Sequence, residues 1–306
     1  MSAFVQMAAT FASNYSGATL LALLLDRHPS ISSDGEIFPV HRGSRGLCAC
    51  GKSQVDCEYY KTVAKHMLAK SETQWNADLF ARHPQYVRIQ SLQRVLVHGW
   101  SLGARLNRIR TAFRLPGMRR ADRSFVDSHM KFMSNSLKFN GTNVYVDGTK
   151  DWRRAELFAS DKQIKMRAIH LVRDGRGFCN SYIKHKKIGK KGLSKAAKVW
   201  VRHIHECDIF RELFSDIPFM IVRYEDICHA YTETIIKICT FLGVPSDVEL
   251  LNNANQSPHV IGNRMRMEFQ GSICEDRSWE EMLTSDEISR ITFQMQDSLR
   301  RFGYID

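Results

Sequence analysis

The sequence predicts an α/β protein of three layers, with a central parallel sheet between two layers of helices. Two observations support this prediction. Short apolar runs rich in β-branched residues recur along the chain, and each is followed by a segment with helical spacing. This alternation is typical of βαβ units in one doubly wound sheet. No repeat, low-complexity tract or long linker interrupts the pattern.

The expected strands are short and, except for the possible strand Ile31–Ser33, apolar, as strands buried on both faces of a parallel sheet are. In chain order they are Phe4–Phe11, Ile31–Ser33, Val144–Val146, Ala168–Val172 and Phe219–Val222. Ligands of such sheets bind at the carboxyl ends of the strands. Polar residues directly after these runs are therefore the first candidates for a site.

The expected helices are Ala18–Leu25, Trp152–Ser160, Phe178–Lys187 and Thr232–Leu242. The last is followed by Gly243 and then a proline, which is a common helix stop. No strand is expected in residues 59–138, which are helical and basic. We expect them to form an insertion that covers the ligand edge of the sheet as a substrate cap, within a single domain of residues 1–306.

The charge of the chain favours an anionic partner, because its 306 residues carry a formal net charge of +12. Residues 88–123 hold nine arginines and one acid, and Lys184–Lys198 holds seven lysines and no acid. Such runs are often solvated faces, and this is the preferred interpretation of the lysine run. The sequence shows no motif with a base-recognition helix or with aromatic residues for base stacking, so nucleic acid is not the expected partner.

The chain is expected to be cytoplasmic, without integral membrane contact. No apolar stretch reaches the roughly 18 residues that a membrane span needs. Met1–Ala12 is apolar but lacks a basic n-region and a cleavage site, so it resembles a first strand rather than a signal peptide. Eight scattered cysteines in a chain of this length do not form a disulfide framework.

The turn after the first expected strand has the residues of a phosphate site. Gly17 permits close approach of the backbone, and Ser16 and Thr19 carry hydroxyl donors at a helix N-terminus. The turn is not a Walker A loop, because Gly-x-x-x-x-Gly-Lys-Ser/Thr is absent. A Ser-Gly-x-Thr turn also occurs often by chance.

A second phosphate site is predicted where Ala168–Val172 ends at Arg173. The guanidinium of Arg173 offers a bidentate fork, and Ser181 follows eight residues later, about two helical turns away. The alternative is an ordinary strand–helix junction with a solvated arginine.

Taken together, these motifs resemble the sulfotransferase superfamily, which uses 3′-phosphoadenosine 5′-phosphosulfate (PAPS) as donor. The resemblance covers nearly the whole chain, and the order and spacing of the motifs make it specific. The motifs are Ser16-Gly17-Ala18-Thr19-Leu20-Leu21, Gly35-Glu36, Cys48-Ala49-Cys50-Gly51 with Cys57, Asp147-Gly148-Thr149-Lys150, Arg173-Asp174-Gly175-Arg176 with Ser181, Arg223-Tyr224-Glu225-Asp226-Ile227, and Gly262-Asn263 with Arg266. Several of them resemble a bacterial-type branch.

The resemblance implies a P-loop-like fold and a site for the donor nucleotide. Residues of the first turn would hold the 5′-phosphate, and Arg173 and Ser181 the 3′-phosphate, with Arg266 closing over the 3′ end. The first-turn residues are Ser16, Gly17, Ala18, Thr19 and Leu20. PAPS is then a co-substrate, and sulfuryl transfer of this kind requires no metal.

Three residues are candidates for the chemistry. Lys150 would stabilise the leaving group, although it could be a surface lysine at a loop. Glu36 would be the general base, or else a cap or loop acid, with Asp34 as the second choice. At the third position, Tyr15, the family carries Lys or Arg, and a phenol cannot neutralise charge at pH 7.

The predicted function is sulfuryl transfer from PAPS to a hydroxyl, or less readily an amine, of a small molecule or carbohydrate. Tyr15 keeps open a second interpretation, a protein that binds the nucleotide without transfer. A P-loop-type kinase is disfavoured because the Walker lysine is absent. The sequence makes no prediction of the oligomeric state.

Four further features are expected to be structural. Trp200 and Trp279 are expected to be core residues rather than adenine platforms, and Asp147 and Glu225 are expected to orient loops or pair with nearby arginines. The cluster Cys48-x-Cys50-x6-Cys57 could bind zinc if His41 were the fourth ligand, but reduced thiols or a redox pair are the preferred interpretation.

Overall fold

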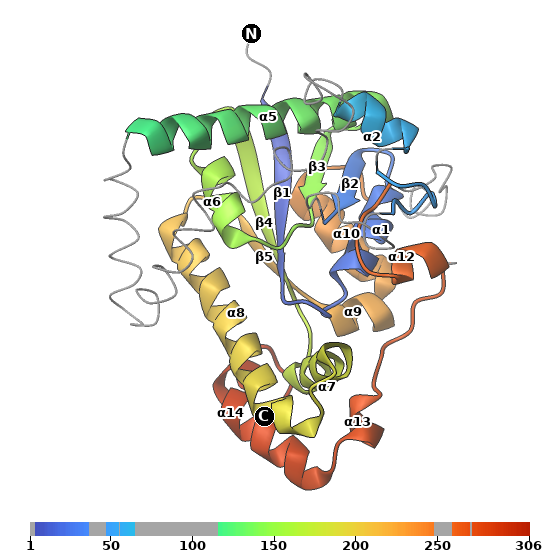
Figure 1. The fold of residues 1–306 in the computed structure, drawn as a ribbon, viewed down its shortest axis with the longest axis vertical. Coiled ribbons are helices and arrows are strands. Elements are labelled where there is room, and N and C mark those ends of the chain that lie inside the picture. The colour runs from blue at the N-terminus through green and yellow to red at the C-terminus, as the bar shows by residue number, and fades with distance from the viewer. Residues whose placement is uncertain (1–3, 37–46, 55, 65–115, 248–258, 270) are drawn as a thin grey trace.

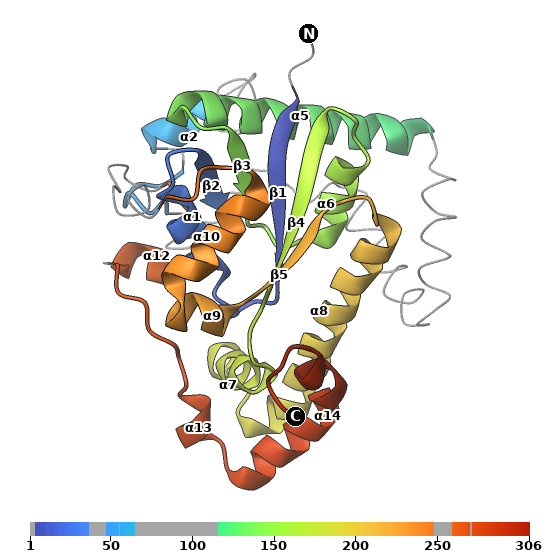
Figure 2. The same ribbon diagram turned by 180° about the vertical axis from the view of Figure 1, so that it is seen from behind.

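The predicted parallel sheet is confirmed. The computed structural model describes the chain except for residues 1–3, 37–46, 55, 65–115, 248–258 and 270. Five parallel strands lie in the order β2-β3-β1-β4-β5. Figures 1 and 2 show helices on both faces of this sheet. The strands are β1 Val5–Ala12, β2 Ile31–Gly35, β3 Val144–Asp147, β4 Ile164–Val172 and β5 Phe219–Arg223.

The expected helices form within three residues of their predicted bounds. The helices of the described residues are α1 Ala18–Asp26, α2 Glu58–Val63, α5 Pro116–Asn140, α6 Trp152–Ala159, α7 Gly175–Lys186, α8 Leu193–Leu213, α9 Tyr224–His229, α10 Tyr231–Leu242, α12 Met265–Glu268, α13 Trp279–Met282 and α14 Ser285–Arg301. α7 begins before Phe178 because the Asp174 side chain caps it by accepting a bond from the Arg176 N–H. β4 extends back to Ile164 through alternating polar residues at its start, where one face of the sheet is open.

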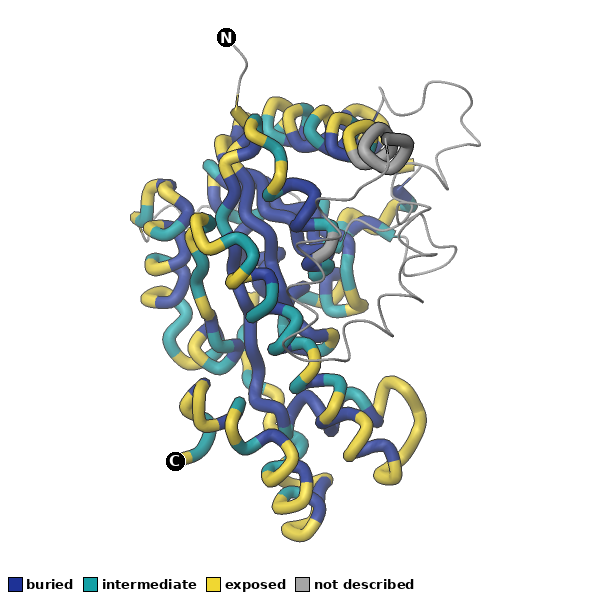
Figure 3. The backbone as a smooth tube through the Cα atoms, turned by 90° about the vertical axis from the view of Figure 1, so that its left-hand side faces the viewer, coloured by how far each residue is buried: buried dark blue, intermediate teal, exposed yellow. Residues whose placement is uncertain are grey.

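The two faces of β1 separate the core into two clusters. Ala8 and Ala12 pack with α1, α9 and α10, and Met7 and Phe11 pack on the other face with α2, α5, α6 and α8. A third cluster joins α7, α8 and α14 beyond the carboxyl ends of the strands. Figure 3 shows the sheet buried between helices that are exposed on their outer sides.

Only parts of the expected insertion at residues 59–138 are described, namely α2 and α5. Figures 1 and 2 show α5 crossing the sheet at the end where β1 begins, which is the amino end of the strands. The N–H of Asn143, just after α5, donates to the carbonyl of Ser30, just before β2. This helix therefore does not cover the ligand edge, and the rest of the expected cap lies outside the described residues.

The lysine run Lys184–Lys198 is a solvated face, as predicted, because all seven of its lysines are exposed. Among the described residues, no helix combines the length and the apolar character needed to cross a membrane.

His170, in the middle of the sheet, makes stability sensitive to acid. It is 1% exposed, and neither ring nitrogen has a hydrogen-bond partner among the described residues. Burial lowers the pKa of His170 to about 3. Since an unfolded histidine has a pKa near 6.5, the unfolded state binds more protons between these values, and stability falls as pH drops below about 6.5.

We expect His170→Leu to remove this part of the acid sensitivity. Between pH 7 and pH 5 the wild type should lose about 2 kcal/mol more unfolding free energy than the variant. Urea unfolding at the two pH values measures the difference. The exposed His229, changed to Gln, is the control. Equal losses in wild type and His170→Leu would contradict the prediction.

Candidate active site

The candidate residues gather at the carboxyl ends of the five strands. Glu36 follows β2, Lys150 follows β3, the loop 13–17 follows β1, Arg173 follows β4 and Glu225 follows β5. Because all the strands are parallel, these ends lie at one edge of the sheet. The predicted site residues are therefore brought to a common edge by the topology.

The loop after β1 is shaped for close packing at Gly17. Its φ of 85° lies in the left-handed region, and a Cβ at this position would lie 2.5 Å from the Tyr224 ring. Ser16 is buried, and its hydroxyl lies 2.6 Å from that of Ser13. Glycine is thus required here by both conformation and space.

The first turn of α1 presents backbone donors. The first hydrogen bond of the helix runs from the Leu21 N–H to the Gly17 carbonyl, and no side chain caps the helix. The N–H groups of Ala18, Thr19 and Leu20 therefore have no partner within the helix. With the positive end of the helix dipole, they form an arrangement that suits an anion. Thr19 also accepts a bond from the Asn263 N–H through Oγ1, at 3.2 Å.

Arg173 is buried and bound on several sides. Its guanidinium donates to the Tyr15 carbonyl at 2.9 Å and to the Ser181 hydroxyl at 3.3 Å. It also lies over the Tyr224 ring, 5.0 Å from the centroid. The predicted pairing of Arg173 with Ser181 is present, and Arg173 joins the β4 end to the loop after β1.

The fork of Arg173 also holds an acid from the C-terminal part of the chain. Nη2 lies 2.7 Å from the carbonyl oxygen of Asp276 and 3.1 Å from its Oδ2. Hydrogen bonds from Ser278, and then the Arg173 guanidinium, lower the pKa of Asp276 despite its partial burial. A carboxylate therefore lies where the sequence predicts a phosphate.

We expect Asp276→Asn to tighten binding of adenosine 3′,5′-bisphosphate about three- to tenfold. The substitution removes a negative charge that competes for Arg173, and it retains the oxygen that accepts from the Ser278 N–H. Calorimetric titration measures the dissociation constant, with the exposed Asp286→Asn as control. Equal affinities for Asp276→Asn and wild type would contradict the competition.

Glu225 accepts two hydrogen bonds near the junction between β4 and α7. Its carboxylate accepts from the Asp174 N–H at 2.9 Å and from the Tyr304 hydroxyl at 2.7 Å, and burial raises its pKa. Trp200 is fully buried and donates to the Arg173 carbonyl, so its expected core role is confirmed. Trp279 is partly buried in the same cluster and lies under Arg176.

Tyr15 lies in the loop after β1, with its ring against α7. Its φ of 67° is unusual for a residue with a side chain, and its carbonyl is held by Arg173. The ring stacks on His185, with centroids 4.7 Å apart and planes 4° from parallel. Contacts with Phe178 and Tyr182 complete an aromatic group. A catalytic role of Tyr15 stays a prediction.

Glu36 and Lys150 form an ion pair across the ends of the neighbouring strands β2 and β3. Their side chains are 20% and 10% exposed, so the pair is partly shielded from water yet accessible. Gly148 lets the two strand ends approach, because a Cβ there would lie 2.8 Å from the Gly35 carbonyl oxygen. Two of the three predicted catalytic residues are thus in direct contact.

The second choice for the base, Asp34, is 1% exposed and points into the core beside Tyr59 and Tyr145. Burial raises the pKa of Asp34 to about 6. Its lack of exposure favours Glu36 as the group that a substrate can reach. Asp147 has the expected structural role, since it accepts from the Thr149 N–H and from Arg154.

Arg266 holds loops together at this edge. It is 5% exposed and donates to the carbonyl oxygens of Leu47, Gly262 and Asn263. Gly262 in turn contacts Thr19, since a Cβ on Gly262 would lie 2.6 Å from Oγ1. Arg266 thus borders the first turn of α1, and its role toward the 3′ end of a nucleotide stays a prediction.

The contacts of Tyr224, Asp276 and His259 were not predicted from the sequence. Tyr224 was identified only as part of a motif, and it packs between Gly17 and Arg173. Asp276 and His259 come from segments without a regular pattern, so no periodicity could indicate where they lie.

Comparison with known proteins gives a partial match in sequence and a match in fold. Residues 165–248, from β4 to beyond α10, match a family model described as "Sulfotransferase family". No curated protein matches the chain in sequence.

Solved structures give matches over nearly the full length. The sulfotransferase domain of the Synechococcus PCC 7002 olefin synthase is 18% identical with a TM-score of 0.55, covering 97% of this chain and 95% of that one. The sulfotransferase domain from the curacin biosynthetic pathway is 16% identical with a TM-score of 0.47, covering 96% and 98%. A Mycobacterium avium sulfotransferase is 12% identical with a TM-score of 0.44, covering 97% and 77%.

The olefin synthase match supports the fold, and the family model covers the segment that carries Arg173, Ser181 and Glu225. The segment 165–248 is thus similar to the sulfotransferase family, and the chain as a whole has the fold of the olefin synthase sulfotransferase domain.

Proposed function

We propose that the protein transfers the sulfuryl group of PAPS to a hydroxyl of a small molecule or carbohydrate. The observation that carries this proposal is the contact of Glu36 with Lys150 at the ligand edge of the sheet. PAPS, when bound, supplies an activated sulfuryl group and a nucleotide that can leave. A transfer of this kind requires a base for the hydroxyl proton and a cation near the leaving oxygen.

We assign these two roles to the ion pair. The Glu36 carboxylate would accept the proton of the acceptor hydroxyl. The Lys150 ammonium would offset the negative charge that develops on the leaving oxygen. Because the two groups are in contact, one small region of the ligand edge can supply both the base and the cation.

The proposed nucleotide site uses two anion-binding elements that flank one short loop. The first turn of α1 offers three backbone N–H groups and the Thr19 hydroxyl, and Arg173 lies at the other end of the loop, bound to the Tyr15 carbonyl. A nucleotide with phosphates on both its 3′ and 5′ positions matches two separate sites of this kind.

A thermal-shift measurement tests the nucleotide site. We expect adenosine 3′,5′-bisphosphate to raise the melting temperature, whereas ATP with Mg²⁺ should raise it little, since only the ligand that fits stabilises the folded state. A larger shift with ATP and Mg²⁺ would favour a kinase.

Turnover tests the transfer itself. PAPS is supplied with a panel of phenols, alcohols and sugars, and formation of adenosine 3′,5′-bisphosphate is followed. We expect acceptor-dependent formation for at least one hydroxyl compound. Binding of the bisphosphate without consumption of PAPS would instead favour a binding protein, in line with the aromatic packing of Tyr15 where the family has a cation.

A further inference from the structure

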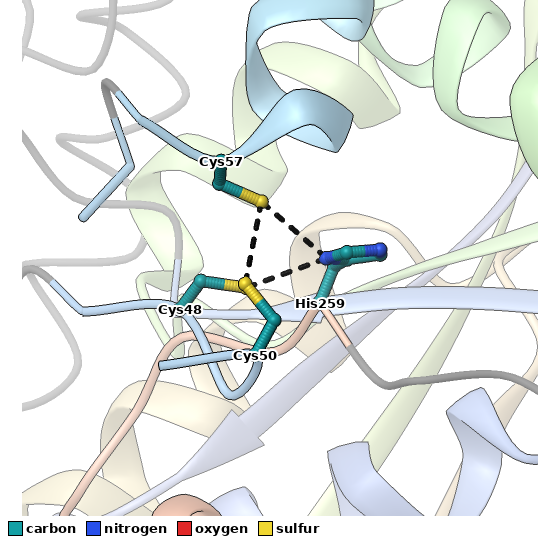
Figure 4. Close-up of side chains that lie close together, drawn as sticks. All are labelled: Cys48, Cys50, Cys57 and His259. Atoms are coloured by element: carbon teal, nitrogen blue, oxygen red, sulfur yellow. Dashed lines mark hydrogen bonds between the residues drawn. The ribbon is translucent and has the colours of Figure 1, made fainter. Parts of the chain in front are cut away.

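Four potential metal ligands converge beside the sheet, and none of them is among the residues assigned to the nucleotide. Cys48, Cys50 and Cys57 come from the loop before α2, and His259 comes from the segment before Ile261. Figure 4 shows the three sulfur atoms and the imidazole pointing toward one another. Cys48 and Cys57 are buried, and Cys50 is exposed.

Three of the distances among these atoms are close to those of a tetrahedral zinc site. All four ligand atoms lie within 4.8 Å of one another. A tetrahedron with the usual Zn–S and Zn–N bond lengths has edges of about 3.8 Å between sulfurs and about 3.6 Å between sulfur and nitrogen. The observed Cys50–Cys57 Sγ distance is 3.7 Å, and His259 Nδ1 lies 3.4 Å from the sulfurs of both Cys48 and Cys57.

Hydrogen bonds among three reduced thiols and one imidazole do not account well for this arrangement. Nδ1 of a neutral imidazole can accept one hydrogen bond, yet two sulfurs approach it at the same distance. A disulfide would require two of the sulfurs to lie at about 2.05 Å, and all the cysteines of the chain are free. One cation at the centre would satisfy all four groups together.

The backbone holds the ligands in place. A tight turn brings Cys50 round to face the other cysteines: Gly51 has a φ of 87° and its N–H donates to the Cys48 carbonyl at 2.9 Å. His259 is fixed by Tyr59, whose ring stacks on it at 4.5 Å, and by the Tyr60 hydroxyl, which donates to its carbonyl. The Ala49 N–H donates to the Val260 carbonyl, which joins the two segments.

We propose that Cys48, Cys50, Cys57 and His259 bind one structural Zn²⁺ ion. Four protein ligands leave no open position, which is typical of a structural rather than a catalytic zinc. Binding replaces the three thiol protons, which pass to solvent, and gives a centre with a net charge of −1. Arg266 donates to the carbonyl of Leu47, next to Cys48, which brings a positive charge near a centre of net charge −1.

The ion would fix the segment that is hydrogen-bonded to the end of β2. His259 is two residues before Ile261, whose N–H donates to the Asp34 carbonyl and whose own carbonyl accepts from the Glu36 N–H at 2.7 Å. Fixing His259 therefore fixes the segment against which Glu36 is placed. His259 is the fourth ligand in place of His41, which the sequence suggested and which lies outside the described residues.

The metal content of the purified protein tests the proposal directly. The full chain is purified under reducing conditions without a zinc supplement, and zinc is measured by atomic spectroscopy. We expect one zinc per chain. Exchange for Co²⁺ should give the visible bands of a tetrahedral thiolate site. A strong chelator should remove the ion and lower the melting temperature, and added Zn²⁺ should restore it.

Variants separate the site from adventitious binding. Cys50→Ser changes a ligand whose residue is exposed, so the variant should fold, lose zinc to the chelator more readily than wild type, and show altered Co²⁺ bands. Cys274→Ser changes another exposed cysteine outside the cluster and should behave like wild type. Zinc-free protein that does not take up Zn²⁺ or Co²⁺, a Cys50–Cys57 disulfide in the folded protein, or unaltered metal binding in Cys50→Ser would overturn the proposal.

Discussion

Changing Glu36 to Gln is expected to lower turnover by about 10²–10⁴-fold, because the substitution keeps the shape of the side chain and removes its basicity. Glu36 is the partly exposed carboxylate at the ligand edge that contacts Lys150, whereas Asp34 is fully buried. The affinity for adenosine 3′,5′-bisphosphate should change little, since no phosphate site uses this carboxylate. Steady-state kinetics and calorimetry measure the two quantities separately.

The control for this variant is Glu281→Gln, an exposed glutamate on α13 that should keep wild-type turnover. The melting temperature of Glu36→Gln shows whether the loss of the ion pair with Lys150 disturbs folding. If folded Glu36→Gln transfers sulfate at the wild-type rate over a pH series, the base is another group. Lys150→Met should also lower turnover, and the double variant should lose less than the product of the two effects if the pair acts as a unit.

The sheet could be predicted from sequence because most residues of β1, β2, β3 and β4 are buried. Val144–Val146 makes up most of β3, and Ala168–Val172, apolar except for His170, forms the C-terminal half of β4. The order of the strands does not follow from such runs. β1 lies between β3 and β4, and this placement depends on how α1 and α5 carry the chain across the sheet. The expectation of a single domain stays a prediction.

The site could be predicted where its residues follow strands. Arg173 stands directly after an apolar run, and Glu36 and Lys150 stand in the short turns after two other expected strands, so the rule for parallel sheets places them at one edge. Their partners could not be predicted in the same way. Asp276 reaches Arg173 from 103 positions away, and His259 reaches Cys48 from 211 positions away. Contacts of this kind depend on packing of loops, which leaves no periodic signal.

Changing Arg173 to Ala is expected to weaken binding of adenosine 3′,5′-bisphosphate about tenfold to a hundredfold. The substitution removes a buried guanidinium whose hydrogen bonds to a phosphate are worth roughly 1.5–3 kcal/mol. Arg173→Lys keeps the charge without the planar fork, so its affinity should be intermediate. Calorimetry gives the dissociation constants, and Arg277→Ala, an exposed arginine close in sequence to Asp276, serves as control.

The structural contacts of Arg173 make a second measurement necessary. Because Arg173 also holds the Tyr15 carbonyl and Asp276, a loss of affinity in Arg173→Ala could come from a displaced loop. A double-variant cycle with Asp276→Asn separates the two causes. If Arg173 binds the phosphate and Asp276 competes for it, Asp276→Asn should tighten binding in the wild type and have no effect once Arg173 is Ala. Unchanged affinity in folded Arg173→Ala, or equal effects of Asp276→Asn in both backgrounds, would show that the phosphate binds elsewhere.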